Sequence, residues 1–94
     1  MLETLWVRFA HPDDGFISDQ ENCRKYLELG KPYRVVHLEE TSSWMTRVKI
    51  EDVGNRCLFN SVMFDFYNNK MEAIPFSLVC NSSQYEDYWN RDII

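Results

Sequence analysis

The sequence predicts a small, mainly β protein with one short helix near its C-terminal end. Stretches in which apolar and polar residues alternate recur along the chain, and a period of two residues is typical of half-buried strands. Turn residues separate these stretches, and apolar residues make up 45% of the chain, which is enough to form a core. Because 94 residues fit one core, we expect residues 1–94 to form a single domain.

The first expected strand covers residues 4–11. Its apolar residues Leu5, Val7 and Phe9 fall on one face, opposite Trp6 and Arg8. The sequence His-Pro-Asp-Asp-Gly that follows ends this strand, because proline lacks a hydrogen-bond donor and Asp and Gly favour turns. The next segment, residues 16–28, is compatible with a short helix or with an irregular stretch.

A second strand is expected at residues 33–39. Val36 and Leu38 fall on one of its faces, and Tyr33 and Val35 fall on the other. Both faces of this strand are therefore expected to contact apolar groups.

Two more stretches follow in the middle of the chain. The alternation of apolar and polar residues is clearest at residues 44–51, which predict a strand with Trp44, Thr46, Val48 and Ile50 on one face. A hairpin turn is expected at residues 52–55. Residues 56–67 are rich in apolar side chains. They predict one strand with apolar contacts on both sides, or a strand that breaks at Asn60 and Ser61.

The last part of the chain begins with a turn at residues 68–70. Residues 74–79 predict an edge strand, because a proline at position 75 costs least at the edge of a sheet. Residues 83–86 fit a capping box that opens a short helix. Three aromatic residues then fall on one helical face, which is expected to pack on the sheet: Tyr85, Tyr88 and Trp89.

Three segments carry a family resemblance. Residues 26–35 read Leu-x-x-Gly-Lys-x-Tyr-x-Val, residues 47–54 contain Val-x-Ile-x-Asp before a glycine, and residues 60–64 contain Ser-x-x-Phe. This pattern resembles small SH3-like barrel proteins of bacteria and phages, over residues 26–64. The resemblance implies an SH3-like antiparallel barrel or a curled sheet that acts as a platform for binding peptides, proteins or nucleic acids. No catalytic residue carries over from it.

Charge and targeting signals narrow the classes of function. The net charge of −5 disfavours direct nucleic-acid binding, which depends on clustered Lys and Arg. The N-terminal residues lack the features of a signal peptide, and no apolar run approaches the roughly 20 residues that span a bilayer. The sequence therefore predicts a cytoplasmic protein without membrane contacts.

No motif for catalysis or for cofactor binding is present, so we expect a protein that is not an enzyme and needs no cofactor. His11 with Asp13 and Asp14 could hold a metal ion, but one imidazole and two adjacent carboxylates favour a solvated loop instead. His37 lies within a strand and is expected to be half-buried. The odd number of cysteines predicts free thiols: Cys23, Cys57 and Cys80.

The leading hypothesis is a non-catalytic module that binds a host or defence-system protein, as an anti-CRISPR protein of a phage does. Aromatic residues are frequent interface anchors, and paired carboxylates could occupy a basic channel meant for phosphates. The alternative for the aromatic residues is that they pack the helix onto the sheet. The candidate partner-binding residues are Trp6, Trp44, Glu39, Glu40, Glu51, Asp52, Tyr85, Glu86, Asp87, Tyr88 and Trp89.

A second hypothesis is a nucleic-acid-binding barrel. Four basic residues and Trp44 could line one face of the sheet, with the tryptophan stacking on a base: Arg8, Arg34, Arg47 and Lys49. The sequence leaves open whether the protein is a monomer or a dimer.

Overall fold

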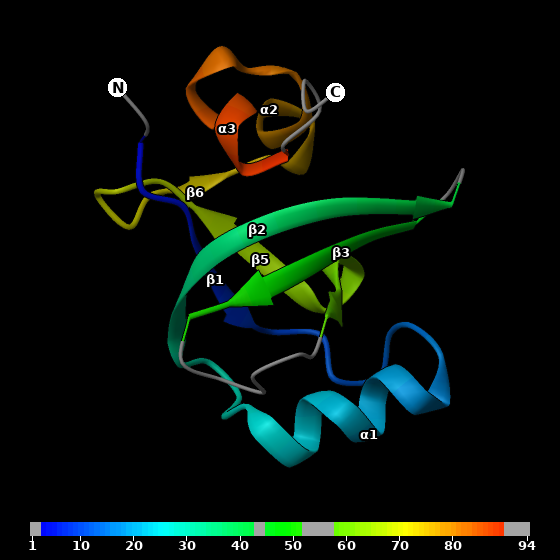
Figure 1. The fold of residues 1–94 in the computed structure, drawn as a ribbon. Coiled ribbons are helices and arrows are strands. Elements are labelled where there is room, and N and C mark those ends of the chain that lie inside the picture. The colour runs from blue at the N-terminus through cyan, green and yellow to red at the C-terminus, as the bar shows by residue number, and fades with distance from the viewer. Residues whose placement is uncertain (1–2, 43–44, 52–57, 90–94) are drawn as a thin grey trace.

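The computed structural model describes residues 3–42, 45–51 and 58–89, and its centre is one antiparallel sheet (Figure 1). The sheet has six strands in the order β4-β3-β2-β1-β5-β6. They are β1 (Trp6–Phe9), β2 (Pro32–Ser42), β3 (Met45–Ile50), β4 (Phe59–Asn60), β5 (Phe64–Tyr67) and β6 (Ala73–Ile74). This architecture confirms the mainly β class. The sheet does not close into a barrel, because β4 and β6 remain as its two edges.

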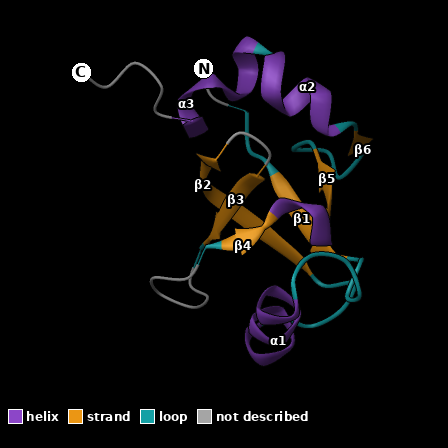
Figure 2. Ribbon diagram, turned by 90° about the vertical axis from the view of Figure 1, so that its right-hand side faces the viewer, coloured by secondary structure: helices purple, strands orange, loops and turns teal. Residues whose placement is uncertain are grey.

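Helical segments lie at two opposite ends of the sheet (Figures 1 and 2). At one end is α1 (Ile17–Tyr26), which settles the open choice for residues 16–28 in favour of a helix. At the other end are α2 (Phe76–Asn81) and α3 (Glu86–Trp89), joined by the 3₁₀ turn η2 (Ser83–Tyr85). A second 3₁₀ turn, η1 (Ser61–Met63), connects β4 to β5. Within the described ranges, no helix is long and apolar enough to cross a membrane.

One cluster of buried side chains joins all these elements. The expected face of the first strand is confirmed, because Leu5, Val7 and Phe9 are at most 2% exposed. From the other strands the cluster takes alternate apolar residues, and it extends to Cys23 and Leu27 at the α1 end. The sheet and both helical ends therefore share one core.

A bulge in β2 changes which residues of this strand face the core. The register with β3 shifts between Val35 and His37, so one extra residue lies in β2. Tyr33, Val35 and Leu38 are buried, whereas Val36 is 47% exposed. The expectation that Val36 and Leu38 share a face is therefore wrong, because strict alternation ends at the bulge.

The segment 56–67 breaks at Asn60 and Ser61, which confirms the second of the two arrangements expected for it. The side chain of Asn60 accepts a hydrogen bond from the backbone N–H of Val62 at 3.2 Å and so caps η1. The turn lets β4 pair with β3 while β5 pairs with β1. The hairpin turn expected at residues 52–55 lies outside the described residues.

The strand expected at residues 74–79 is largely wrong. Only Ala73 and Ile74 pair with β5, and Pro75 begins α2 as its N-cap. Phe76, Val79 and Cys80 face the core at helical spacing, and the rings of Phe66 and Phe76 lie 4.9 Å apart. A proline is tolerated at the start of a helix, where its missing N–H would have no partner in any case.

The C-terminal segment holds the first strand in place. The hydroxyl of Tyr88 accepts a hydrogen bond from the N–H of Leu5 at 3.0 Å and donates one to the carbonyl of Glu3 at 3.1 Å. The indole N–H of Trp89 donates to the carbonyl of Val79 at 3.1 Å. The expected packing of this aromatic face is confirmed, but the cap differs from the expected one. Ser82, one residue earlier, accepts from the N–H of Gln84 in the turn before α3.

Candidate interaction surfaces

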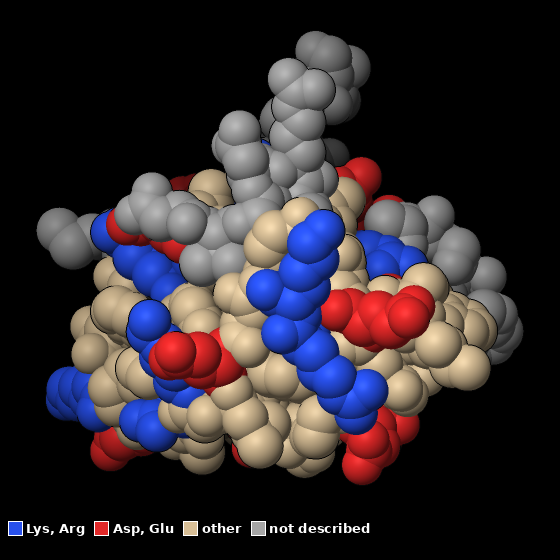
Figure 3. Space-filling view, turned by 90° about the horizontal axis from the view of Figure 1, so that it is seen from below, with Lys and Arg blue, Asp and Glu red and all other residues tan. Residues whose placement is uncertain are grey.

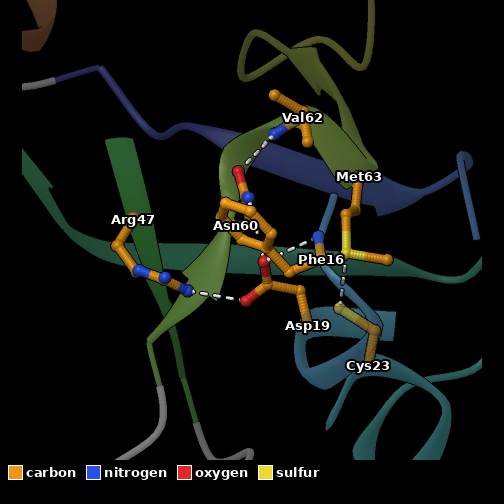
Figure 4. A network of polar contacts seen from close by, with 7 residues as sticks. All are labelled: Phe16, Asp19, Cys23, Arg47, Asn60, Val62 and Met63. Atoms are coloured by element: carbon orange, nitrogen blue, oxygen red, sulfur yellow. Dashed lines mark hydrogen bonds and ion pairs between the residues drawn. The ribbon is translucent and has the colours of Figure 1, made fainter. Parts of the chain in front are cut away.

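A buried polar network joins α1 to the sheet (Figure 4). Asp19 lies in the first turn of α1 and is 7% exposed. Its carboxylate accepts hydrogen bonds from Arg47 on β3 at 2.8 Å, from the side chain of Asn60 at 3.1 Å and from the N–H of Phe16 at 3.2 Å. Each of these contacts comes from a different segment, so the network fixes the position of α1 on the sheet.

The charge of Asp19 is stabilised by these partners. Burial alone would raise the pKa of this carboxyl group, but the hydrogen bonds from Arg47, Asn60 and Phe16 outweigh burial and lower the pKa below its ordinary value. A carboxylate so fully occupied has little capacity to take up a proton near neutral pH. We therefore assign the network a structural role.

The thiol nearest this network is that of Cys23. Cys23 is fully buried, and its sulfur lies 3.5 Å from the sulfur of Met63. Burial, followed by the charge of Asp19, raises the pKa of the Cys23 thiol to about 12. Since the thiolate is the nucleophilic form of cysteine, this arrangement disfavours a nucleophilic role for Cys23.

Two large apolar side chains protrude where α1 begins. Phe16 is the N-cap residue and is 62% exposed, and Ile17 is the first residue of the helix and is 74% exposed. A phenylalanine side chain cannot accept the hydrogen bond that Ser, Thr, Asp or Asn would accept at an N-cap. The side chains of Phe16 and Ile17 therefore contribute neither a cap nor core packing, and we call these two residues the apolar tip.

The turn before the apolar tip fixes its direction. Gly15 has a φ of +77°, a conformation that disfavours other residues, and a Cβ atom there would lie in contact with Asn60 and Asp19. The carboxylate of Asp13 pairs with Arg24 at 2.9 Å, which ties this turn to the last turn of α1. Asp14 and Glu21 are exposed near the start of α1, so the tip has acidic residues close to it in the chain.

Trp6 and Arg34 line a shallow hollow on the outer face of the sheet. They are cross-strand neighbours, and the hollow of about 430 Å³ extends to Thr4, Pro32 and Glu51. Arg34 pairs with Glu51 at 3.2 Å. The cationic character of this hollow is therefore largely cancelled.

Three of the four basic residues of the nucleic-acid hypothesis are engaged with other side chains of the chain. Arg47 is paired with the buried Asp19, Arg34 is paired with Glu51, and the guanidinium of Arg8 lies 5.2 Å from the ring centre of Tyr67. On the face seen in Figure 3, Lys and Arg side chains lie beside Asp and Glu, and neither sign covers the face. These contacts weaken the case for binding phosphates, but they leave the hypothesis a prediction.

A second hollow, of about 500 Å³, lies between separate parts of the sheet. Thr46 of β3 lies on one side of it, and Phe64 and Phe66 of β5 lie on the other. Val62, which is 51% exposed, contributes from η1. We call this hollow the seam, because it lies where the sheet would have to join to become a barrel.

The predicted aromatic anchors divide between the core and the surface. Tyr85, Tyr88 and Trp89 are at most 6% exposed, so the expectation that they are surface anchors is corrected. Their rings are needed to pack α3 against the sheet. Trp6 is partly exposed in the outer hollow, and Trp44 lies outside the described residues.

Those of the predicted acidic residues that the structure describes lie at the surface. Glu39 and Glu40 are exposed on β2, Glu86 and Asp87 are exposed on α3, and α3 packs against β2. Glu51 is engaged with Arg34, and Asp52 lies outside the described residues. The side chain of Glu39 lies 3.9 Å from the half-buried His37.

His11 and Asp13, which the possible metal site would combine, contact different partners. The ring of His11 lies 2.7 Å from the carboxylate of Asp65 on β5, and Asp13 pairs with Arg24 instead. Among the described residues, no three His, Cys, Asp or Glu side chains gather closely enough to hold a metal ion.

Sequence reasoning missed the apolar tip and Val62. A signal for the tip existed, because Phe16 and Ile17 directly follow a turn sequence at a position where polar capping residues are preferred. No comparable signal marks Val62, since it lies in an apolar stretch that also supplies the core.

The open sheet with helical segments at its two ends defines the chain as a small antiparallel β-sheet protein. Residues 4–90 match the family described as bacteriophage T4 protein Y07B, and the chain belongs to this family. No curated protein and no solved structure shows significant similarity to it.

Proposed function

We propose that this chain is a non-catalytic accessory protein of a phage that binds a host protein and modulates its activity. Membership of the family of bacteriophage T4 protein Y07B supports the phage setting. In its finer form the proposal is that the host target belongs to a defence system, so that the chain acts as an inhibitor of the anti-CRISPR kind.

The observation that carries the proposal is the apolar tip. The side chains of Phe16 and Ile17 are mostly exposed and neither cap the helix nor belong to the core. Exposed apolar side chains that the fold does not need are typical of interface anchors. The network around Asp19 holds α1 rigidly beneath the tip, so little conformational freedom has to be lost when a partner binds.

The first experiment compares the wild-type protein with the double variant Phe16→Ser/Ile17→Ser. Tagged protein is used to retain host proteins, and the retained protein is then purified and its affinity measured. We expect the double variant to lose affinity by about tenfold or more, since buried anchors account for most of the binding energy of an interface.

The matched control is Leu29→Ser, because Leu29 is 64% exposed and lies beyond the other end of α1. Both variants should have the thermal stability of the wild type. The proposal is contradicted if the wild type retains no host protein, or if the double variant binds the retained protein as tightly as the control does.

The finer form is tested in host cells that carry an active CRISPR system. Expression of the wild-type chain should raise the plating efficiency of a targeted phage, and the double variant should fail to do so. Equal plating with and without the wild-type chain would exclude inhibition of that system and leave the broader proposal to the binding experiment.

A further inference from the structure

The seam is an apolar hollow with hydrogen-bonding groups at its border. Five apolar side chains line it, two buried in the core and three partly open to solvent: Phe64, Phe66, Val62, Ile74 and Phe76. Thr46 faces them from β3. The hollow thus offers a surface that can receive an apolar side chain without displacing the core.

On each side of the seam, one strand extends beyond the strand that pairs with it. The pairing of β4 with β3 ends at Arg47 and does not reach Thr46. The pairing of β6 with β5 ends at Phe66, so Phe64 and Asp65 lack a strand neighbour on that side within the described residues. Where a strand has no neighbour, its backbone N–H and C=O groups can pair with an extended peptide, which then adds a strand to the sheet.

Among the described residues, Asp65 is the only charged one that lines the seam, and it is about half exposed and pairs with His11. The whole chain also carries a net charge of −5. An acidic peptide would therefore be repelled, whereas a neutral or basic peptide would be accepted.

We propose that the seam binds an extended, neutral to basic peptide segment of a partner protein. The segment lies as an added strand between β3 and β5 and inserts apolar side chains against Val62 and Phe76. This site is separate from the apolar tip. A negative result for one of the two sites therefore does not contradict the proposal for the other.

The probes are capped peptides of the sequence Lys-Thr-X-Thr-X-Thr-Lys, in which X is Val, Leu or Phe. Binding is followed by the backbone amide signals of the isotope-labelled protein in NMR titrations. We expect at least one peptide to bind below about 1 mM and to shift the signals of Thr46, Val62 and Asp65.

Two peptide controls separate strand addition from unspecific apolar contact. N-methylation of alternate peptide bonds keeps the side chains but removes donors, and it should weaken binding by about tenfold or more. Replacing the terminal lysines by glutamates should also weaken binding, because the site is acidic.

Two protein variants form a matched pair. Val62→Arg should weaken binding by about tenfold or more, because it places a charged side chain at the border of the seam. Val36→Arg makes the same substitution at a similarly exposed valine on the outer face of β2 and should bind as the wild type does.

The proposal is overturned if no peptide shifts the seam signals at about 1 mM. It is also overturned if the N-methylated peptide binds equally well, or if Val62→Arg and Val36→Arg behave alike. Neither substituted side chain belongs to the core, so thermal stability provides the check that both variants fold.

Discussion

Asp19 is a charged residue at the border of the core, and its surroundings explain why the fold tolerates it. Three donors from three segments occupy its carboxylate, and Arg47 is the one that carries a full opposite charge. A buried charge that loses its partner costs far more free energy than an exposed pair gains. The ion pair of Arg34 and Glu51 is exposed on both sides and provides the comparison.

The first prediction compares two arginine substitutions. Arg47→Met leaves the carboxylate of Asp19 without its charged donor and should lower the free energy of unfolding by about 2 kcal/mol. Arg34→Met should lower it by less than about 1 kcal/mol. Urea unfolding of both variants at neutral pH measures the two losses of free energy of unfolding. Equal losses would contradict the structural role assigned to the network around Asp19.

The second prediction concerns the pH dependence of stability. The pKa of Asp19 in the folded protein lies below its ordinary value of 3.8, so the unfolded chain takes up this proton more readily. The stabilisation by ionised Asp19 is therefore complete above the unfolded pKa and is lost as the pH falls through the folded pKa.

Asp19→Asn removes the titrating group and keeps the shape of the side chain. The wild type should be more stable than this variant near pH 6, and the difference should shrink as the pH falls to about 2. Unfolding curves at several pH values test this, and a difference that stays constant with pH would show that Asp19 does not titrate as described.

The strands and helices differ in how well the sequence predicts them. For β1 and the second half of β3 the alternation of residues is enough, because Val7 and Phe9 in β1, and Val48 and Ile50 in β3, form one buried face. In β2 a bulge moves Val36 out of the core, and no local pattern shows where a bulge will fall. For α2, the mainly apolar segment 76–80 is compatible with a strand or a helix when it is considered alone. The packing of Phe76 on Phe66 favours the helix.

The third prediction tests how α3 holds β1. Tyr88→Phe keeps the ring but removes the acceptor of the buried Leu5 N–H and the donor to the carbonyl of Glu3. This should cost about 1–3 kcal/mol of stability, because a buried backbone donor is left without a partner. Tyr26→Phe, at a residue that is 39% exposed, is the control and should be close to neutral. Both are measured by thermal unfolding.

At the scale of the whole molecule, the described residues share one core. The radius of gyration of 12.5 Å agrees with the roughly 12 Å expected for a compact domain of this length. The sequence could predict the mainly β class and the size of the core. It could not predict the apolar tip or the seam, because both depend on how distant segments come together. The SH3-like resemblance stays a prediction.

The fourth prediction is that the molecule unfolds as one unit. Since the buried cluster joins α1, the sheet and the C-terminal helices, no part should lose its structure separately. Circular dichroism and tryptophan fluorescence should give coincident urea transitions. Two separated transitions would show that the C-terminal helices unfold on their own and would contradict a single domain.

The contact between Glu3 and Tyr88 has a practical consequence for handling the protein. It brings residues close to the two ends of the chain side by side, at the end of the sheet opposite α1 (Figure 1). A tether attached beside this contact, for example at the exposed Asp87 of α3, therefore holds the molecule by its α3 side. An immobilised protein presents Phe16 and Ile17 toward the solution, so a sensor surface can be loaded without masking the residues whose binding is to be measured.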